Sequence, residues 1–439
     1  MLIRICLSLA LLVAMPVWSQ VEPSATGPPP SSDEAMQTPP PVSGQAYPTE
    51  TGSETRSNYL RAGLNLQTAY DDNVQPGTTS KPVSDVIYSI TSSFALDQIT
   101  PRAHRTLTYS PGFTLYQPTS ALNALSQNAT VSYQYKLSPH VQISVQDSFV
   151  QASNVFDQPF GGVSGSTQYP TEAVVAPFAD QLSDAASGET TFQFSRNGMI
   201  GAGGTYSIVN YPNQAQASGL PNSNSYGGSA FYNRRLSSSQ YMGVNYQYSK
   251  MSSSSASGDS VTQVDTIYSF YTLYLGHSLS LSVSGGPQHF DVTQAQLPAS
   301  ASWTPAVTAS MGWQRNQTNF AVNYSRTVTG AGGLFGAFQS NSANASAHWQ
   351  LARTWTVGSA ANYAIYKSAT PLSPSSSQGG HTVSGTVSAH HPISERFSAE
   401  VGYSRIHQSY SRIAAVSENP DGDHAYISIS YQFTRPLGR

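Results

Sequence analysis

From Tyr59 to the end of the chain, apolar and polar residues alternate with a period of two in one segment after another. Successive side chains of a β-strand point to opposite faces of a sheet, so each segment has one apolar and one polar face. The last segment is the clearest, and its apolar set is Ala425, Ile427, Ile429, Tyr431 and Phe433. The pattern predicts an all-β structure for residues 59–439.

The connections between these segments alternate between short turns and long polar loops. The short turns lie at 98–105 and near Ser138-Pro139, Asn197-Gly198, Ser238, His277, Asn316, Arg353 and Glu395. Long loops rich in Ser, Gly, Pro, Asn and Gln are expected at 151–187, 210–224, 250–262, 290–302, 329–341, 367–381 and 408–422. This alternation is typical of a transmembrane antiparallel β-barrel, with short periplasmic turns and long extracellular loops. Eight short turns predict about 18 strands, and weak segments at 188–196, 226–236 and 381–391 leave 16 possible.

Composition excludes several other classes. Charged residues make up 10% of the chain, hydrophobic residues 38%, and the mean hydropathy is -0.29. These values disfavour an ordinary soluble α/β enzyme and leave no room for several apolar helical spans. A net charge of -3 without a basic stripe gives no support to nucleic-acid binding. A propeller, the main soluble alternative, would have four short strands in each repeat and loops of similar length.

The N-terminal part of the chain has a different character. Residues 1–19 carry Arg4 and an apolar run, and we expect them to be a cleaved signal peptide. Residues 20–58 are rich in Pro and Ser and are expected to form a disordered periplasmic linker. The only cysteine, Cys6, lies in the predicted signal peptide. The mature chain would therefore have no disulfide and no zinc–cysteine site.

Three motifs in the first part of the repeat region resemble a known family. They are Tyr70-Asp71-Asp72-Asn73-Val74, the segment Tyr109–Tyr116, and the segment Ser138–Asp147. Their order resembles the outer-membrane beta-barrel porin type 2 family, which includes exopolysaccharide-associated members of Gram-negative bacteria. The resemblance covers residues 59–150 and implies an outer-membrane barrel with a transport or export role and no catalytic residues.

The last strand resembles the C-terminal assembly signal of outer-membrane proteins. Its candidate residues are Ile427, Ile429, Tyr431 and Phe433. The resemblance implies that the barrel assembly machinery and the lipid bilayer are partners of the chain. One departure is that six further residues follow Phe433, where the family pattern ends on the aromatic residue.

Few residues suggest reaction chemistry. Asp71-Asp72-Asn73 and Asp421-Gly422-Asp423-His424 offer calcium-type ligands, but neither has EF-hand spacing. A solvated loop start and a polar turn are the favoured interpretations. His390 and His391 would point to opposite faces of a strand and could not chelate one ion. We therefore predict no catalytic residues, no metal site and no cofactor, and a protein that is not an enzyme.

The polar face predicts the character of a lumen. Its residues are mostly Ser, Thr, Asn, Gln and Gly, without opposed rows of acidic and basic residues. Charged rings give a pore its ion selectivity, so we expect a porin-like channel for small neutral polar solutes, or a part of a polysaccharide export system. The loop 151–187 is the candidate constriction. The alternative is a non-conducting outer-membrane scaffold or adhesin that acts through its surface loops.

Aromatic residues recur near the predicted strand ends, where they would form girdles at the two membrane interfaces. They are Tyr59, Tyr70, Tyr88, Tyr109, Tyr116, Phe149, Trp303, Trp313, Trp349, Trp355, Tyr366, Tyr403 and Phe433.

Overall fold

The computed structural model describes residues 58–74, 81–152, 180–213, 220–255, 258–275, 278–294, 298–315, 317–329, 336–352, 354–369, 379–410 and 421–437. The strands are β1 (Tyr59–Asp71), β2 (Asp85–Ile99), β3 (Ala103–Tyr116), β4 (Ala124–Lys136), β5 (Val141–Ala152), β6 (Gln181–Ser195), β7 (Gly198–Asn210), β8 (Asn222–Ser237), β9 (Gln240–Ser255), β10 (Gly258–Leu275), β11 (Leu279–Gln294), β12 (Ser300–Arg315), β13 (Thr318–Thr329), β14 (Phe338–Gln350), β15 (Thr356–Ser368), β16 (Gly379–Pro392), β17 (Phe397–Tyr410) and β18 (Asp421–Pro436). A short 3₁₀ helix, η1 (Ser120–Leu122), lies between β3 and β4. None of the described helical segments is long and apolar enough to cross a membrane.

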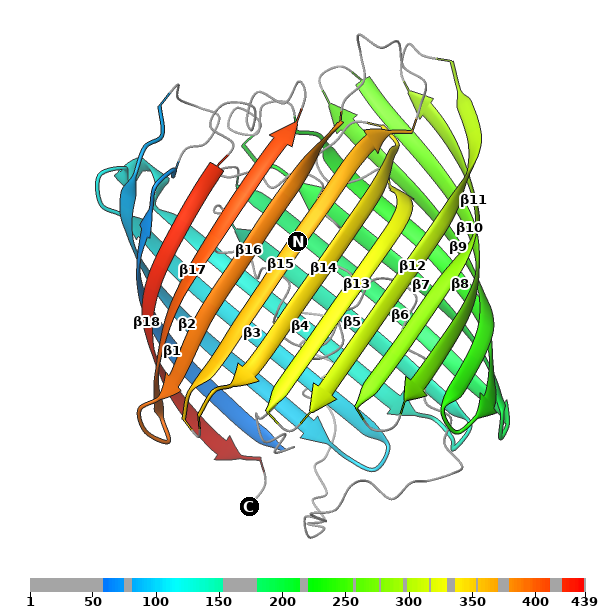
Figure 1. Cartoon of the computed structure of the whole chain (residues 1–439), viewed down its shortest axis with the longest axis horizontal. Coiled ribbons are helices and arrows are strands. Elements are labelled where there is room, and N and C mark those ends of the chain that lie inside the picture. Colours follow the sequence, from blue (N-terminus) through cyan, green and yellow to red (C-terminus); the bar gives the residue numbers. More distant parts are fainter. Residues whose placement is uncertain are drawn as a thin grey trace.

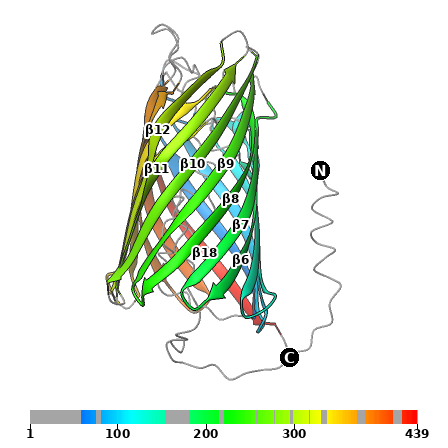
Figure 2. The same cartoon turned by 90° about the vertical axis from the view of Figure 1, so that its right-hand side faces the viewer.

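Each strand pairs antiparallel with the next one in the chain, and β1 also pairs with β18 (Figure 1). The result is a closed barrel of 18 strands, and Figure 2 shows part of its wall from outside. The prediction of 18 strands is confirmed, and the possibility of 16 is wrong. The three weak segments form most of β6, β8 and β16.

The predicted turns at 98–105 and near Ser138-Pro139, Asn197-Gly198, Ser238 and Glu395 coincide with the ends of consecutive strands. The turn residues His277, Asn316 and Arg353 lie outside the described residues, in short gaps between consecutive strands. Two long loops were wrong: 250–262 and 290–302 are mostly strand, belonging to β9–β10 and β11–β12. Strands in this sector run to 16–18 residues and rise above the rest of the barrel in Figure 1. The outward-facing residues at the loop ends of these strands do not have to contact lipid. Polar residues therefore occupy these positions, and the alternation of apolar and polar residues is lost there. Ser254, Asp259 and Asp291 are examples.

The predicted constriction loop 151–187 is only partly described. Residues 153–179 lie outside the described residues, while 181–187 belong to β6 rather than to a loop. The signal peptide and nearly all of the linker, residues 1–57, also lie outside the described residues and stay predictions.

The outer face of the wall is apolar. Large hydrophobic side chains are exposed on every strand, and Ile427 and Ile429 of β18 are 58% and 51% exposed. Tyr431 and Phe433 lie on the same face, because they pair with Leu64 and Ala62 of β1. Trp303 and Trp313 are ten residues apart on the outer face of β12. On a strand tilted by about 40° this spacing spans roughly 25 Å, the height of the apolar band of outer-membrane barrels.

A closed barrel with such a band is an outer-membrane protein, because no sheet edge is left open to hydrocarbon. Three of the predicted girdle residues are an exception. Tyr59 pairs with Asp97 of the inner wall and therefore faces the lumen. Tyr116 and Tyr366 are each 4% exposed and face the lumen, since they pair with Ile87 and Ser340 on its wall.

The inner face has no single hydrophobic core. About half of the buried residues are Ser, Thr, Asn and Gln, and the buried hydrophobic residues of the described chain form small separate clusters. The largest joins β9, β10 and β11 to the end of the β13–β14 hairpin.

Candidate functional site

The inner face of the wall carries paired hydroxyl groups from neighbouring strands. Thr272 Oγ1 lies 2.9 Å from Ser282 Oγ, and Ser284 Oγ lies 2.6 Å from Thr308 Oγ1. Further round the barrel, Thr382 Oγ1 lies 2.6 Å from the Tyr410 hydroxyl. Each of these cross-strand pairs satisfies its members without a charge. The wall therefore offers a lumen neutral donors and acceptors.

Several charged groups of the inner wall lie against partners of opposite or complementary character. His104 Nε2 lies 3.0 Å from Asp97 Oδ1 near the turn end, and His424 Nδ1 lies 3.7 Å from Asp71 Oδ2 near the loop end. Glu400 accepts a hydrogen bond of 2.7 Å from the Tyr426 hydroxyl. Each of these acidic groups therefore has an imidazole or a hydroxyl donor beside it on the inner wall.

The two acidic motifs of the sequence meet at the junction of β1 and β18. The Asp423 backbone N–H donates to Asp72 Oδ1 at 2.7 Å, and the Asp72 N–H donates to the Asp423 carbonyl at 3.1 Å. Asn73 Nδ2 donates to the Asp421 carbonyl at 2.6 Å. The expectation of a solvated loop start at Asp71-Asp72-Asn73 was wrong, since Asp71 is 1% exposed and Asn73 is 4% exposed. The second motif is the start of β18 rather than a turn before it.

Burial raises the pKa of the Asp72 carboxyl, and the nearby charges of Asp423 and Asp71 raise it further. On the outer side, Arg405 lies 3.4 Å from Asp421 and 3.8 Å from Asp423. Within the described ranges, no group of three or more His, Cys, Asp or Glu residues is arranged to hold a metal ion. His390 and His391 point to opposite faces, with His390 paired to Glu400 and His391 against the Trp355 ring. We interpret these contacts as a set of polar interactions that joins the end of β1 to the start of β18.

The second feature of the wall is an interruption between β12 and β13. Their ladder ends at the pair Val307–Arg326, although β12 continues to Ser300 and β13 to Thr329. The Gln314 N–H donates to the Ser278 carbonyl before β11, so the even residues of β12 hydrogen-bond toward β11 and the odd ones toward β13. The next hydrogen-bonded pair would join Pro305 to Val328. Pro305 has no N–H, so the ladder ends there.

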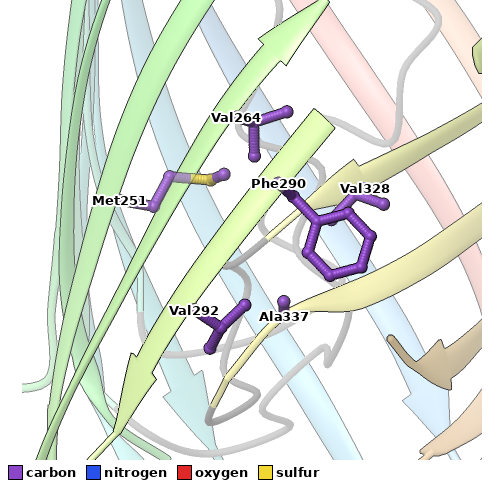
Figure 3. Packing of buried hydrophobic residues seen from close by; sticks show 6 residues of the cluster. All are labelled: Met251, Val264, Phe290, Val292, Val328 and Ala337. Carbon is purple, nitrogen blue, oxygen red and sulfur yellow. The ribbon is translucent and has the colours of Figure 1, made fainter. Parts of the chain in front are cut away.

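The side chain of Gln288 of β11 provides the hydrogen-bond acceptor that the backbone of β12 no longer provides to β13. Its Oε1 accepts the Val328 N–H at 2.8 Å, and its Nε2 donates to Thr266 Oγ1 of β10 at 3.0 Å. Val328 and Ala337 then pack against Met251, Val264, Phe290 and Val292 on the inner wall (Figure 3). Gly336, with φ of +110°, comes so close to Gln294 that a Cβ there would lie 2.3 Å from the amide nitrogen. The end of the hairpin beyond the last wall pair, residues 327–329 and 336–339, is therefore folded inward.

This hairpin end was not among the predicted site residues. The loop 329–341 was predicted only by its polar composition. The signal was Pro305, a proline inside a segment with strand periodicity, which marks an unpaired edge. The role of Gln288 could not have been predicted, because the proximity of Gln288 to Val328 depends on the register of three strands.

No family model matches the chain, and no curated protein sequence matches it either. Solved structures do match. The OpdK channel of Pseudomonas aeruginosa, solved with vanillate, is 11% identical, with 86% of this chain and 99% of that one covered and a TM-score of 0.41. OccAB4 of Acinetobacter baumannii is 10% identical, with 87% and 99% covered and a TM-score of 0.42.

The ferric-catecholate import receptor Fiu of E. coli K12 is 8% identical, with 85% of this chain and 81% of that one covered and a TM-score of 0.42. Similarity at this level carries no functional argument.

Proposed function

We propose that the protein is a passive outer-membrane channel for neutral polar solutes. The observation that carries the proposal is the inner wall of paired hydroxyl and amide groups, in which acidic groups such as Asp97 and Asp71 lie against histidines. Hydroxyl and amide groups exchange hydrogen bonds with sugars as readily as with water, and charged rings are what sort ions. Barrels of 16–18 strands commonly leave an aqueous channel.

A finer proposal concerns the class of solute. The resemblance of residues 59–150 to the porin type 2 family, with its exopolysaccharide-associated members, supports a role in glycan export. The neutral wall suits an uncharged glycan better than an acidic one. We propose that the infolded end of the β13–β14 hairpin is the narrowest part of the lumen on the loop side, because it packs on the inner faces of β10 and β11.

Planar-bilayer recording tests the channel. We expect stable single-channel steps, with a reversal potential close to zero across a potassium chloride gradient. Liposome swelling with neutral sugars of increasing size then measures the size limit. A strong preference for anions or cations would contradict the argument from the wall. The absence of any open level would instead favour the alternative of a surface scaffold.

A further inference from the structure

A shallow apolar depression follows the free edge of β12. It has a volume of about 430 Å³ and is lined by Gly286, Pro287, Trp303, Thr304, Pro305, Ala306 and Val307. Trp303, Pro305 and Val307 belong to the outer face of β12, whereas Thr304 and Ala306 belong to its inner face. The depression therefore wraps around the edge that has no β13 partner in the described part of the chain.

The depth of this depression determines what it can meet. It begins at Trp303 and extends to Val307, four residues further toward Trp313. Those two tryptophans mark the two borders of the apolar band, so the depression lies in its outer half. The molecules that contact the wall at this depth are lipids of the outer leaflet. Apolar walls of Pro287, Pro305 and Val307 suit an acyl chain and offer nothing to a sugar.

A cation lies beside the same edge. Arg326 is paired with Val307 and is partly buried. The Gln339 amide is best satisfied with its oxygen toward Arg326, at 2.8 Å from Nε and 2.7 Å from Nη2, and 3.3 Å from Thr304 Oγ1. Within the described ranges no carboxylate forms an ion pair with Arg326, so the charge lacks an anion. Placing an arginine at the depth of the membrane costs free energy unless an anion pairs with it.

The edge supplies further hydrogen-bond donors. By the alternation established above, the backbone N–H groups of Ala301 and Trp303 point toward the side without a strand. Arg326 has five N–H donors, and two lie on Gln339. A phosphate head group, which has several acceptor oxygens and a negative charge, complements this set.

We propose that the β12 edge and Arg326 form a binding site for one anionic lipid of the outer leaflet. Its phosphate lies on the guanidinium of Arg326, and an acyl chain lies along Pro287, Pro305 and Val307. The lipid completes the wall where the β12–β13 ladder stops. The site does not depend on whether the barrel conducts.

Quenching of Trp303 fluorescence tests the site. The other four tryptophans are replaced by phenylalanine, and the folded protein is placed in phosphatidylcholine vesicles. Phosphatidylglycerol or phosphatidylcholine with brominated acyl chains is then added as the quencher. We expect Trp303 to select the anionic lipid by about five-fold, the effect of one basic residue at a membrane surface.

Arg326→Gln should remove this selectivity. The matched control is Arg315→Gln, the same change on the outer face of β12 at its turn end, and selectivity should persist there. Equal quenching by both lipids in the unchanged barrel, or equal loss in both variants, would overturn the site.

If Arg326→Gln does not fold, competition in the unchanged barrel decides. Unbrominated phosphatidylglycerol must relieve the quenching and unbrominated phosphatidylcholine must not. Inorganic phosphate must also fail to relieve it, because a lipid anchored by its acyl chain is not displaced by a free anion. Any other result contradicts the proposal.

Discussion

Replacing Gln288 by methionine should release the end of the β13–β14 hairpin from the inner wall. Gln288 is 3% exposed, and its side chain bonds Val328 N–H at 2.8 Å and Thr266 Oγ1 at 3.0 Å. Methionine has a similar length and fills the same space, so little cavity is created. The change removes both hydrogen bonds and leaves the Val328 N–H buried without an acceptor.

The size of the effect follows from these contacts. A buried hydrogen bond contributes about 1 kcal/mol, and a buried donor left without a partner costs about 1–3 kcal/mol. We expect a net loss of roughly 2–3 kcal/mol for the infolded position. This corresponds to a rise of roughly 30- to 150-fold in the fraction of molecules with the hairpin end released.

Cysteine labelling measures that fraction. Ala337 is 1% exposed, so a cysteine placed there should react slowly with a maleimide in a chain whose Cys6 is replaced by serine. Gln288→Met should raise the labelling rate by the factor given above, since labelling follows the open population. Gln134→Met, a change to an exposed lumen-facing glutamine of β4, is the control. A rate that changes less than about three-fold, roughly 0.6 kcal/mol, would refute the role of Gln288.

Three further predictions concern the wall itself. The pKa of Asp72 is raised in the folded barrel, so ionisation of this carboxyl destabilises the fold. The stability that the protonated Asp72 contributes is fully present at low pH and is lost as the pH rises through the pKa of Asp72 in the folded state. Asp72→Asn should therefore raise the temperature at which the folded gel band is lost at pH 7, with no gain at a pH well below the ordinary value of 3.8; an equal gain at both would contradict it. Pro305→Val restores a backbone N–H opposite Val328, and the added hydrogen bond should stabilise the barrel by about 1 kcal/mol and raise the temperature at which the folded gel band is lost. An unchanged transition temperature would show that another residue ends the ladder. Ile429→Arg puts a charge on the lipid face and should cost about 2–4 kcal/mol in refolding titrations, whereas Gln432→Arg faces the lumen and should cost much less.

The strand count and the turns could be predicted because they depend on local chemistry. A two-residue turn such as that between Ser237 and Gln240 interrupts the alternation within a few residues, so it is visible in the sequence. The lengths of β9–β12 could not be predicted from apolar alternation. Above the membrane both faces of a strand can be polar, and a Ser-rich strand then has the composition of a loop.

The candidate site divides in the same way. The neutral wall was predictable from the polar alternates. The contact between Asp72 and Asp423 was in principle predictable too, because the first and last strands of a closed barrel must pair and both motifs lie at the loop end. The inward fold of the β13–β14 hairpin end was not, since it depends on which side of β12 Pro305 faces.

The pairing of β1 with β18 has a consequence for how the molecule forms. Thirteen residues of β1 find partners that lie more than 350 positions later in the chain. Pairing over such a separation is slow, because a long stretch of chain must be ordered before the contact forms. β1 can pair early with β2, but its other edge waits until β18 exists. A chain cut short before β18 is therefore not a smaller barrel; it is a sheet with two bare edges, which hydrocarbon does not tolerate.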